Sequence, residues 1–218
     1  MVSSEPLILA EGLRKVYRMG NVEVHALRGV DLKTRRREFL AIVGPSGSGK
    51  STLLHRIGCL DTPTGGRVLI DGVETSKLDG WALARLRRER IGFVFQQFNL
   101  MRSLTAIENV ALPMVFAGVS RAERLETARR LLEKVELGSR LHHKPSELSG
   151  GEQQRVAIAR ALANDPDIIL DSEVGGVVMD IFRELNDEGR TVIIVTHNPE
   201  VARRARRIVR MKDGRTIE

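Results

Sequence analysis

The chain has 218 residues, of which 42% are hydrophobic and 29% are charged, and its formal net charge is +7. These values fit one globular domain with a buried core and exclude a disordered or low-complexity chain. No apolar run approaches the roughly 18 residues of a membrane-spanning helix. The N-terminus also lacks the layout of a secretory signal, so we expect a cytoplasmic chain that acts at a membrane only through a partner.

The first hundred residues predict short strands and turns, interrupted by one helix. The run Phe39–Val43 (FLAIV) is apolar throughout, which indicates a strand buried on both faces. A helix is expected directly after it at Lys50–Gly58, and Asp71-Gly72 has the composition of a hairpin turn. The strands expected in this part cover residues 7–13, 26–32, 39–43, 67–70 and 91–95.

Beyond Asn99 the apolar spacing changes to a helical period. Ser120 and Glu123 have the spacing of a capping box, and an apolar stripe follows from Ala122 to Val135. We therefore expect a helical subdomain at about 98–162, inserted into one domain whose α/β core is formed by about 1–97 and 163–218.

Strands and helices alternate in the last part of the chain. We expect strands at 168–170, 191–196 and 207–211, and helices at 177–185 and 199–206. This alternation predicts a mainly parallel sheet, whose ligands bind at the carboxyl ends of the strands.

A phosphate-binding loop is predicted by the segment Gly44-Pro45-Ser46-Gly47-Ser48-Gly49-Lys50-Ser51, which fits G-x-x-x-x-G-K-[ST] at every fixed position. The glycines allow the backbone N–H groups to surround an anion, and the helix that follows adds its positive N-terminal end. Lys50 supplies a cation for the outer phosphates, and Ser51 supplies a hydroxyl for Mg²⁺. This loop indicates a nucleotide and does not by itself distinguish kinases, GTPases and motors.

A second helix start that could bind an anion is predicted at Leu148-Ser149-Gly150-Gly151-Glu152-Gln153. Ser149 and Glu152 again have capping-box spacing, and the two glycines expose backbone N–H groups just before the helix. Two phosphate-binding elements in one chain suggest a composite site, in which the second element is offered to another subunit.

The same six residues resemble the signature motif of ATP-binding cassette (ABC) ATPases, and the resemblance covers essentially the whole chain. The segments IGCLDTPTGGRVLIDG, IGFVFQQFNL and LTAIENVALP resemble most the subfamily that serves lipoprotein release and macrolide or antimicrobial-peptide export. The cell-division cassette is similar. The resemblance implies an α/β fold with a P-loop core and a mainly parallel sheet, an N-terminal antiparallel β subdomain and an inserted helical subdomain.

The resemblance also implies roles for single residues. Tyr17 matches the aromatic that stacks on adenine, and Thr52 follows Ser51 in the nucleotide-binding segment. Gln96 matches the glutamine that touches Mg²⁺ and senses the transmembrane partner, with Gln97 as the competing choice. His197 matches the switch histidine at the γ-phosphate, although Asn198 stands where the family usually has an acid.

The segment DPDIILDSEVGGVVMDIF raises the question of the catalytic acids. Family members have an Asp for magnesium and an adjacent Glu as the base after a strand of about four apolar residues. In one placement Asp171 and Glu173 are these acids, but Asp171 comes one residue early, which turns its side chain to the opposite face. In the other placement Asp171 and Ser172 belong to a later loop at a dimer interface, and about eight residues with both acids are missing between Leu170 and Asp171. The spacing favours the second placement and predicts impaired hydrolysis.

The predicted function is that of an ATP-binding subunit of an ABC transporter, with ATP and Mg²⁺ as cofactors. It would form a homodimer with ATP bound and work with a transmembrane permease at the cytoplasmic face of the membrane. Two alternatives are a non-hydrolysing regulatory module, like the cell-division relative, and a soluble ABC protein acting on nucleic acid or ribosomes. Basic clusters are scattered and aromatic residues are only 4%, so we expect no specific nucleic-acid binding.

Overall fold

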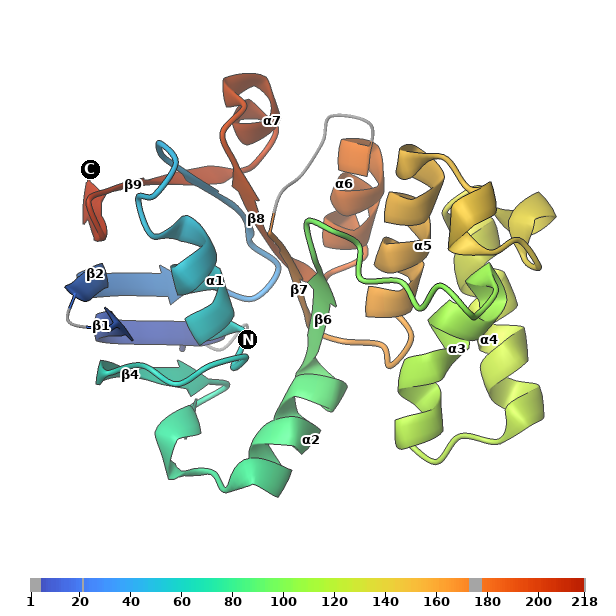
Figure 1. Cartoon of the computed structure of the whole chain (residues 1–218), viewed down its shortest axis with the longest axis horizontal. Coiled ribbons are helices and arrows are strands. Elements are labelled where there is room, and N and C mark those ends of the chain that lie inside the picture. The colour runs from blue at the N-terminus through green and yellow to red at the C-terminus, as the bar shows by residue number, and fades with distance from the viewer. Residues whose placement is uncertain (1–4, 21, 173–177, 218) are drawn as a thin grey trace.

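A six-stranded sheet runs through the middle of the structure (Figure 1). The structure is a computed structural model and describes residues 5–20, 22–172 and 178–217. The strand order is β10-β9-β3-β8-β7-β6, and every neighbouring pair is parallel except β10 and β9. The strands are β3 (Phe39–Val43), β6 (Ile91–Val94), β7 (Ile168–Asp171), β8 (Thr191–Thr196), β9 (Arg207–Lys212) and β10 (Arg215–Ile217). The predicted, mainly parallel sheet is confirmed.

A second sheet is antiparallel, with the order β2-β1-β4-β5. Its strands are β1 (Ile8–Met19), β2 (Val22–Thr34), β4 (Gly65–Ile70) and β5 (Val73–Glu74). β1 and β2 are longer than the sequence predicted, and bulges interrupt their pairing. The predicted turn between β4 and β5 is confirmed, since Asp71 and Gly72 both have positive φ angles, 52° and 77°.

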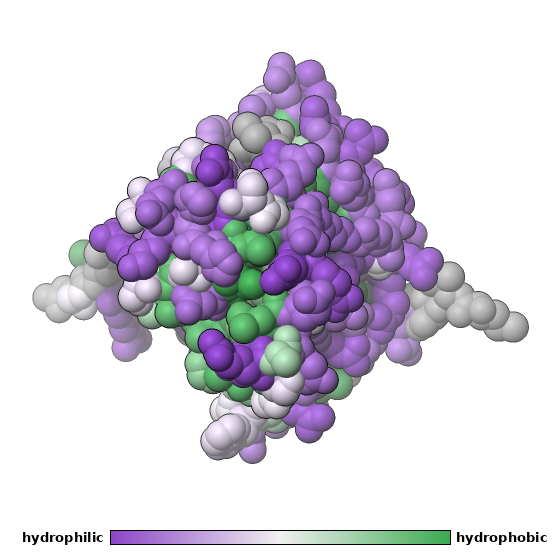
Figure 2. Space-filling view, turned by 90° about the vertical axis from the view of Figure 1, so that its right-hand side faces the viewer, coloured by the Kyte–Doolittle hydropathy of each residue, from purple (hydrophilic) through white to green (hydrophobic). Residues whose placement is uncertain are grey.

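The helices cover both faces of the parallel sheet (Figure 1). They are α1 (Lys50–Ile57), α2 (Gly80–Arg90), α3 (Ala106–Phe116), α4 (Arg121–Lys134), α5 (Gly150–Ala161), α6 (Met179–Asp187) and α7 (Pro199–Arg203). Short 3-10 turns are η1 (Thr75–Lys77), η2 (Gly138–Arg140) and η3 (Pro145–Glu147). Helices α3, α4 and α5 lie together at one end of the molecule, where Figure 2 shows a mostly hydrophilic surface around a small hydrophobic group.

Two apolar clusters hold these layers together, one on each face of the parallel sheet. Leu40 and Ile42 of β3 pack with α1 and the antiparallel sheet, whereas Phe39 and Ala41 pack with the helices on the other face. The prediction that Phe39–Val43 is buried on both faces is therefore confirmed. Helix α1 lies between the two sheets, which fixes the loop that precedes it.

Helix α2 was missed by the expectation of a single helix in the first hundred residues. Its described side chains include none that is buried, so it lacks the apolar periodicity on which the prediction depended. Asp79 caps its start by accepting a hydrogen bond from the Ala82 N–H at 2.8 Å. Asp79, as a typical N-cap residue, is the sequence feature that could have indicated this helix.

Candidate functional site

The loop that joins β3 to α1 packs closely against neighbouring backbone. Gly49 has a φ of 97°, and a Cβ there would lie 2.4 Å from the Ala26 carbonyl oxygen. A Cβ at Gly44 would lie 2.2 Å from the Met211 carbonyl oxygen. Both distances are far inside van der Waals contact, so these two positions of the predicted phosphate loop require glycine.

Lys50 begins α1 and directs its ammonium group back over this loop. Its Nζ donates hydrogen bonds to the carbonyl oxygens of Gly44 at 2.9 Å and Pro45 at 2.8 Å. The helix start at Gly49 has no side-chain cap among the described residues. The loop thus combines a cationic side chain with the positive end of a helix dipole, a combination that attracts an anion such as a phosphate.

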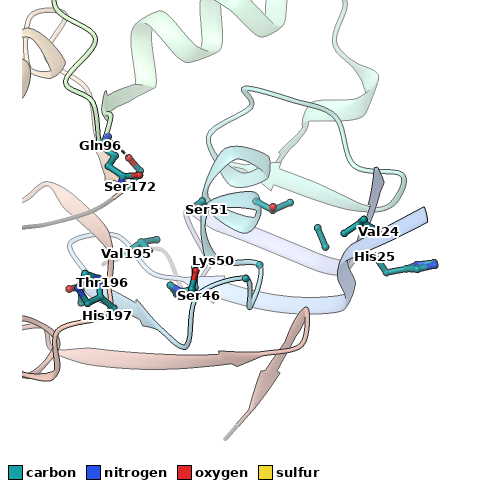
Figure 3. Close-up of a pocket in the computed structure, with 14 residues that line it drawn as sticks. Val24, His25, Ser46, Lys50, Ser51, Gln96, Ser172, Val195, Thr196 and His197 are labelled. Atoms are coloured by element: carbon teal, nitrogen blue, oxygen red, sulfur yellow. Dashed lines mark hydrogen bonds between the residues drawn. The ribbon is translucent and has the colours of Figure 1, made fainter. Parts of the chain in front are cut away.

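A cavity of about 640 Å³ opens beside the loop (Figure 3). Its walls come from the loop and the start of α1, from strand β2 and the end of β8, and from the segments that follow β6, β7 and β8. The lining residues are Val24, His25, Ala26, Ser46, Gly47, Gly49, Lys50, Ser51, Thr52, Gln96, Ser172, Val195, Thr196 and His197. Gly44, Pro45 and Ser48 belong to the same loop without lining the cavity.

Three of these lining residues follow the carboxyl ends of parallel strands. Gln96 comes after β6, Ser172 comes directly after β7, and His197 comes directly after β8. The strands β6, β7 and β8 are neighbours in the sheet. Residues far apart in the sequence therefore meet at one edge, as expected for ligand sites in parallel sheets. Gln97, the competing choice, does not belong to the lining.

Ser172 connects β7 to the segment after β6. Its Oγ accepts a hydrogen bond from the Gln96 backbone N–H at 2.8 Å, and its own N–H donates to the Val94 carbonyl oxygen at 3.1 Å. Figure 3 shows Gln96 and Ser172 side by side at the wall of the cavity. Ser172 was expected in a dimer-interface loop, and no pattern in the sequence indicates this contact with Gln96.

Asp171 is the last residue of β7 and is 1% exposed. It pairs with Val94 on one side and with Ile194 on the other. This position differs from the expected loop at a dimer interface, because the residue continues the strand. Asp171 is also absent from the cavity lining, in line with the alternation of side chains along a strand. Glu173, the other acid considered, lies outside the described residues.

Leu170 and Asp171, between which the two acids were expected to be missing, are consecutive residues of one continuous strand. Leu170 pairs with Phe93 of β6 and Ile193 of β8, and Asp171 continues the same register. The expected end of the strand at Leu170 is therefore wrong by one residue. Leu170 is fully buried in the apolar cluster around α1 and does not line the cavity, so it belongs to the core and not to the site. The absence of both acids at this junction, relative to other family members, stays a prediction.

His197 is exposed at the cavity and is followed by Asn198, which has a local structural role. The Asn198 side chain caps α7 by accepting a hydrogen bond from the Glu200 N–H at 2.8 Å. Its backbone N–H donates to Thr196 Oγ1 at 3.1 Å. The residue that departs from the family pattern thus shapes the turn that carries His197.

Tyr17 lies beside the cavity without lining it. In the β1–β2 pairing it stands directly opposite Val24, which does line the cavity. Its hydroxyl accepts a hydrogen bond from Arg56 Nη2 at 3.0 Å. The β2 residues Val24, His25 and Ala26 were not predicted as site residues, because no motif marks them and only the strand pairing brings them to the site.

The predicted signature segment forms the start of α5, and its capping box is present. Ser149 Oγ accepts from the Glu152 N–H at 3.3 Å, and the Ser149 N–H donates to Glu152 Oε2 at 2.8 Å. This hydrogen bond from the Ser149 backbone, with the Ser149 hydroxyl and Arg140 as further causes, holds the pKa of Glu152 below its usual range. Leu148 is buried, whereas Ser149 and Gly150 are exposed. None of these residues lines the cavity at Lys50, so one chain does not bring its two anion-binding elements together.

The described residues contain neither a membrane-spanning helix nor a cluster of metal-binding side chains. Across residues 5–20, 22–172 and 178–217, no helix is both long and apolar enough to cross a membrane. In the same ranges no group of three or more His, Cys, Asp or Glu side chains is placed to hold a metal ion.

Comparison with known proteins identifies the family. A family model described as "ABC transporter" matches residues 27–173. An ABC transporter ATP-binding protein of Thermotoga maritima is 54% identical over 209 residues, which cover 92% of this chain and 89% of that protein. The macrolide export ATP-binding/permease protein MacB of Hyphomonas neptunium is 50% identical over 220 residues. These cover 97% of this chain but 34% of MacB, so the chain spans about a third of that relative.

Solved structures agree with this assignment and with the predicted fold. The ATP-binding cassette MJ0796 of Methanocaldococcus jannaschii, in a dimeric post-hydrolysis state bound to ADP and Pi, matches with a TM-score of 0.91. The sequences are 46% identical, and the match covers 97% of each chain. A second dimeric structure of the same cassette matches with a TM-score of 0.91 and 47% identity, again over 97% of each chain.

Proposed function

Because the chain belongs to the ABC transporter family, we propose that it is the ATP-binding subunit that drives export or lipoprotein release through a separate permease. The single observation that carries this proposal is the cavity shared by Lys50, Gln96 and His197. These residues come from three distant parts of the sequence, and each has the chemistry needed to bind the triphosphate end of a nucleotide.

ATP would bind with its phosphates against the loop at residues 44–51. The Lys50 ammonium group now lies on the carbonyl oxygens of Gly44 and Pro45, from which it can turn toward a phosphate. The hydroxyl of Ser51 and the imidazole of His197 face the same cavity. Since the cavity continues to Val24 and His25, the base and ribose would extend toward β2 and Tyr17.

Mg²⁺ would be held mainly through the phosphates. It prefers hard oxygen ligands, and the Ser51 hydroxyl and the Gln96 amide are the candidates in the cavity. Among the described lining residues none carries a carboxylate. A cation bound this way neutralises phosphate charge. It makes fewer contacts with the protein than it would make if two acidic ligands were present.

A second copy of the chain would complete the site. The start of α5 lies outside the cavity of its own chain, and Ser149 and Gly150 are exposed. The dimeric MJ0796 structures support a pair of cassettes as the working unit. In this arrangement each α5 start would meet the phosphates bound by the partner.

The permease would dock at a groove of about 1210 Å³ between α2, β6, α3 and α5. Trp81 and Phe116 line it and are 89% and 72% exposed, and large exposed aromatics are typical of protein interfaces. Phe95 and Asn99 also line it, so the groove adjoins Gln96, which is expected to sense the transmembrane partner, and the start of the predicted helical subdomain at about 98–162. A permease docked in this groove would hold the chain at the cytoplasmic face of a membrane as a peripheral subunit.

Hydrolysis would be weak in this chain. The family hydrolyses ATP, but the part of the cavity that the structure describes has no carboxylate, and Asp171 is buried in β7. Loss of a general base typically reduces turnover by about 10²–10⁴-fold. The same observation favours the second candidate, a non-hydrolysing ATP-binding module that regulates assembly.

ATP binding and ATP turnover, measured separately on the purified chain, test the proposal. We expect ATP to bind and turnover to be at least about 100-fold slower than in an ABC cassette with both acids. Ordinary turnover would contradict the impairment and leave the transporter function in place. No detectable ATP binding would contradict the proposed function itself.

A further inference from the structure

A buried arginine lies in the last turn of α1, the helix whose first residue is Lys50. The Arg56 side chain is only 1% exposed. A buried charge destabilises a fold unless it is paired and hydrogen-bonded. The partners of Arg56 therefore indicate what the residue holds in place.

The partners of Arg56 come from β1 and from the segment after α1. Its Nη2 donates to the Tyr17 hydroxyl at 3.0 Å and forms an ion pair with Asp61 Oδ2 at 2.5 Å. Its Nη1 donates to the Thr62 carbonyl oxygen at 3.0 Å. Lys15 Nζ donates to Asp61 Oδ1 at 3.1 Å and lies 5.1 Å from the centre of the Tyr17 ring. The ring is thus held at its hydroxyl by one cation, while a second cation faces its π-system.

The held ring adjoins the end of the cavity that is remote from the phosphates. Tyr17 and Val24 are directly opposite in an antiparallel pair, so their side chains lie on the same face of that sheet. Val24 lines the cavity. With phosphates at Lys50, the base of a nucleotide extends toward this part of β2, where the Tyr17 ring is the nearest aromatic surface on β1.

We propose that Arg56 is a positioning residue for nucleotide binding, which fixes the Tyr17 ring beside the nucleotide base. The inference rests on the proposed ATP site. Helix α1 then sets both ends of that site: its first turn holds the phosphates through Lys50 and Ser51, and its last turn holds the aromatic ring. The spacing between phosphate contacts and base contacts is fixed by one rigid element.

Two variants remove the same hydrogen bond from opposite sides. Tyr17→Phe keeps the ring and removes the hydroxyl, whereas Arg56→Met keeps the hydroxyl and removes the guanidinium. Binding of ATP and of tripolyphosphate, which lacks the base, is measured by calorimetry for each variant and for the double variant. The readout is the preference for ATP over tripolyphosphate. Arg129→Met on α4, an exposed arginine, is the matched control.

We expect each single variant to lower the preference for ATP about fivefold, since stacking of a base on an aromatic ring contributes about 1–3 kcal/mol. The double variant should lower it no further, because both changes remove one hydrogen bond. Tripolyphosphate affinity should stay at the unsubstituted value in Tyr17→Phe, and Arg129→Met should change neither ligand.

An unchanged preference in Tyr17→Phe would overturn the inference, and this variant decides the matter where Arg56→Met does not fold. Equal losses for ATP and tripolyphosphate in Arg56→Met would also overturn it, because they would mean that Arg56 only supports the phosphate loop. Failure of the unsubstituted chain to bind ATP would instead contradict the proposed function, so the two failures are distinguishable.

Discussion

The Gln96 backbone N–H donates a hydrogen bond to Ser172 Oγ at 2.8 Å, which joins the ends of β6 and β7 at the wall of the cavity. Ser172 is held there by its own N–H, which donates to the Val94 carbonyl oxygen at 3.1 Å. Its predecessor, Asp171, is buried in β7. Because successive side chains of a strand point to opposite faces, the Asp171 side chain points away from the face on which Ser172 lines the cavity. A hydroxyl therefore faces the cavity at the end of β7, and the nearest described carboxylate in that strand does not.

A carboxylate at residue 172 should make ATP binding depend more strongly on Mg²⁺. In Ser172→Asp the new side chain can still accept the Gln96 N–H, and it adds a negative charge near the proposed cation. An ion interaction of about 1 kcal/mol corresponds to roughly a fivefold increase in the ratio of ATP affinities with Mg²⁺ and with EDTA. Ser172→Asn, which has the same shape without the charge, is the control. Equal ratios for the Asp and Asn variants would count against the proposed cation position.

The start of α5 should be required for dimer formation but not for ATP binding by one chain. Ser149→Ala removes a cap and should destabilise the fold by about 1 kcal/mol. Ser120→Ala removes the matching capping box of α4 and should cost about the same. Light scattering with ATP present should show that only Ser149→Ala impairs dimer formation. Loss of the dimer in both variants would mean that stability, rather than the α5 surface, controls association.

The Asp61 carboxylate should stabilise the fold through Arg56. Asp61→Asn leaves a buried guanidinium without its charged partner, which we expect to lower the free energy of unfolding by about 1–2 kcal/mol. This value is smaller than for a fully buried pair because Asp61 is partly exposed. Asp187→Asn, which breaks the exposed pair with Arg206, should cost less than about 0.5 kcal/mol. Urea unfolding at neutral pH compares the three chains.

The ion pair between Arg56 and Asp61 also predicts that the free energy of unfolding depends on pH. The hydrogen bond from Arg56, followed by that from Lys15, holds the pKa of Asp61 well below its usual range. Because the folded pKa of Asp61 lies below its unfolded value of about 4, the contribution of this carboxylate to stability is present above about pH 4. That contribution is lost as the pH falls further. The stability difference between the unsubstituted chain and Asp61→Asn should therefore narrow below about pH 4. A difference that stays constant under acid would exclude an electrostatic origin.

Much of the fold could be predicted because buried parallel strands have continuous apolar runs. The runs at Phe39–Val43 and Thr191–Thr196 locate strand ends, and therefore predict that Lys50 and His197 lie at one edge of the sheet. Both capping boxes, at Ser120 and Ser149, were also readable, since they depend on spacing within one helix turn. Local patterns of this kind do not require knowledge of the tertiary structure.

The rest of the site depends on pairing between distant segments. Val24 reaches the cavity through the register of two long strands with bulges, and no residue type in β2 indicates this. The orientation of Ser172 depends on where β7 ends, and a shift of one residue would have turned Asp171 toward the cavity. Buried Arg56 was unexpected because its partners, Tyr17 and Asp61, come together only in the folded chain.

Equilibrium binding of radiolabelled ATP to the Lys50→Ala variant tests the central claim most directly, with Lys77→Ala as a control on the surface. Lys77 is exposed and lies outside the cavity, whereas Lys50 lies over the phosphate loop. Loss of a charge-assisted contact of about 1.5–3 kcal/mol should weaken ATP binding by at least about tenfold in Lys50→Ala. Lys77→Ala should bind as the unsubstituted chain does. Equal ATP affinity in the two variants would contradict the assignment of this cavity as the ATP site.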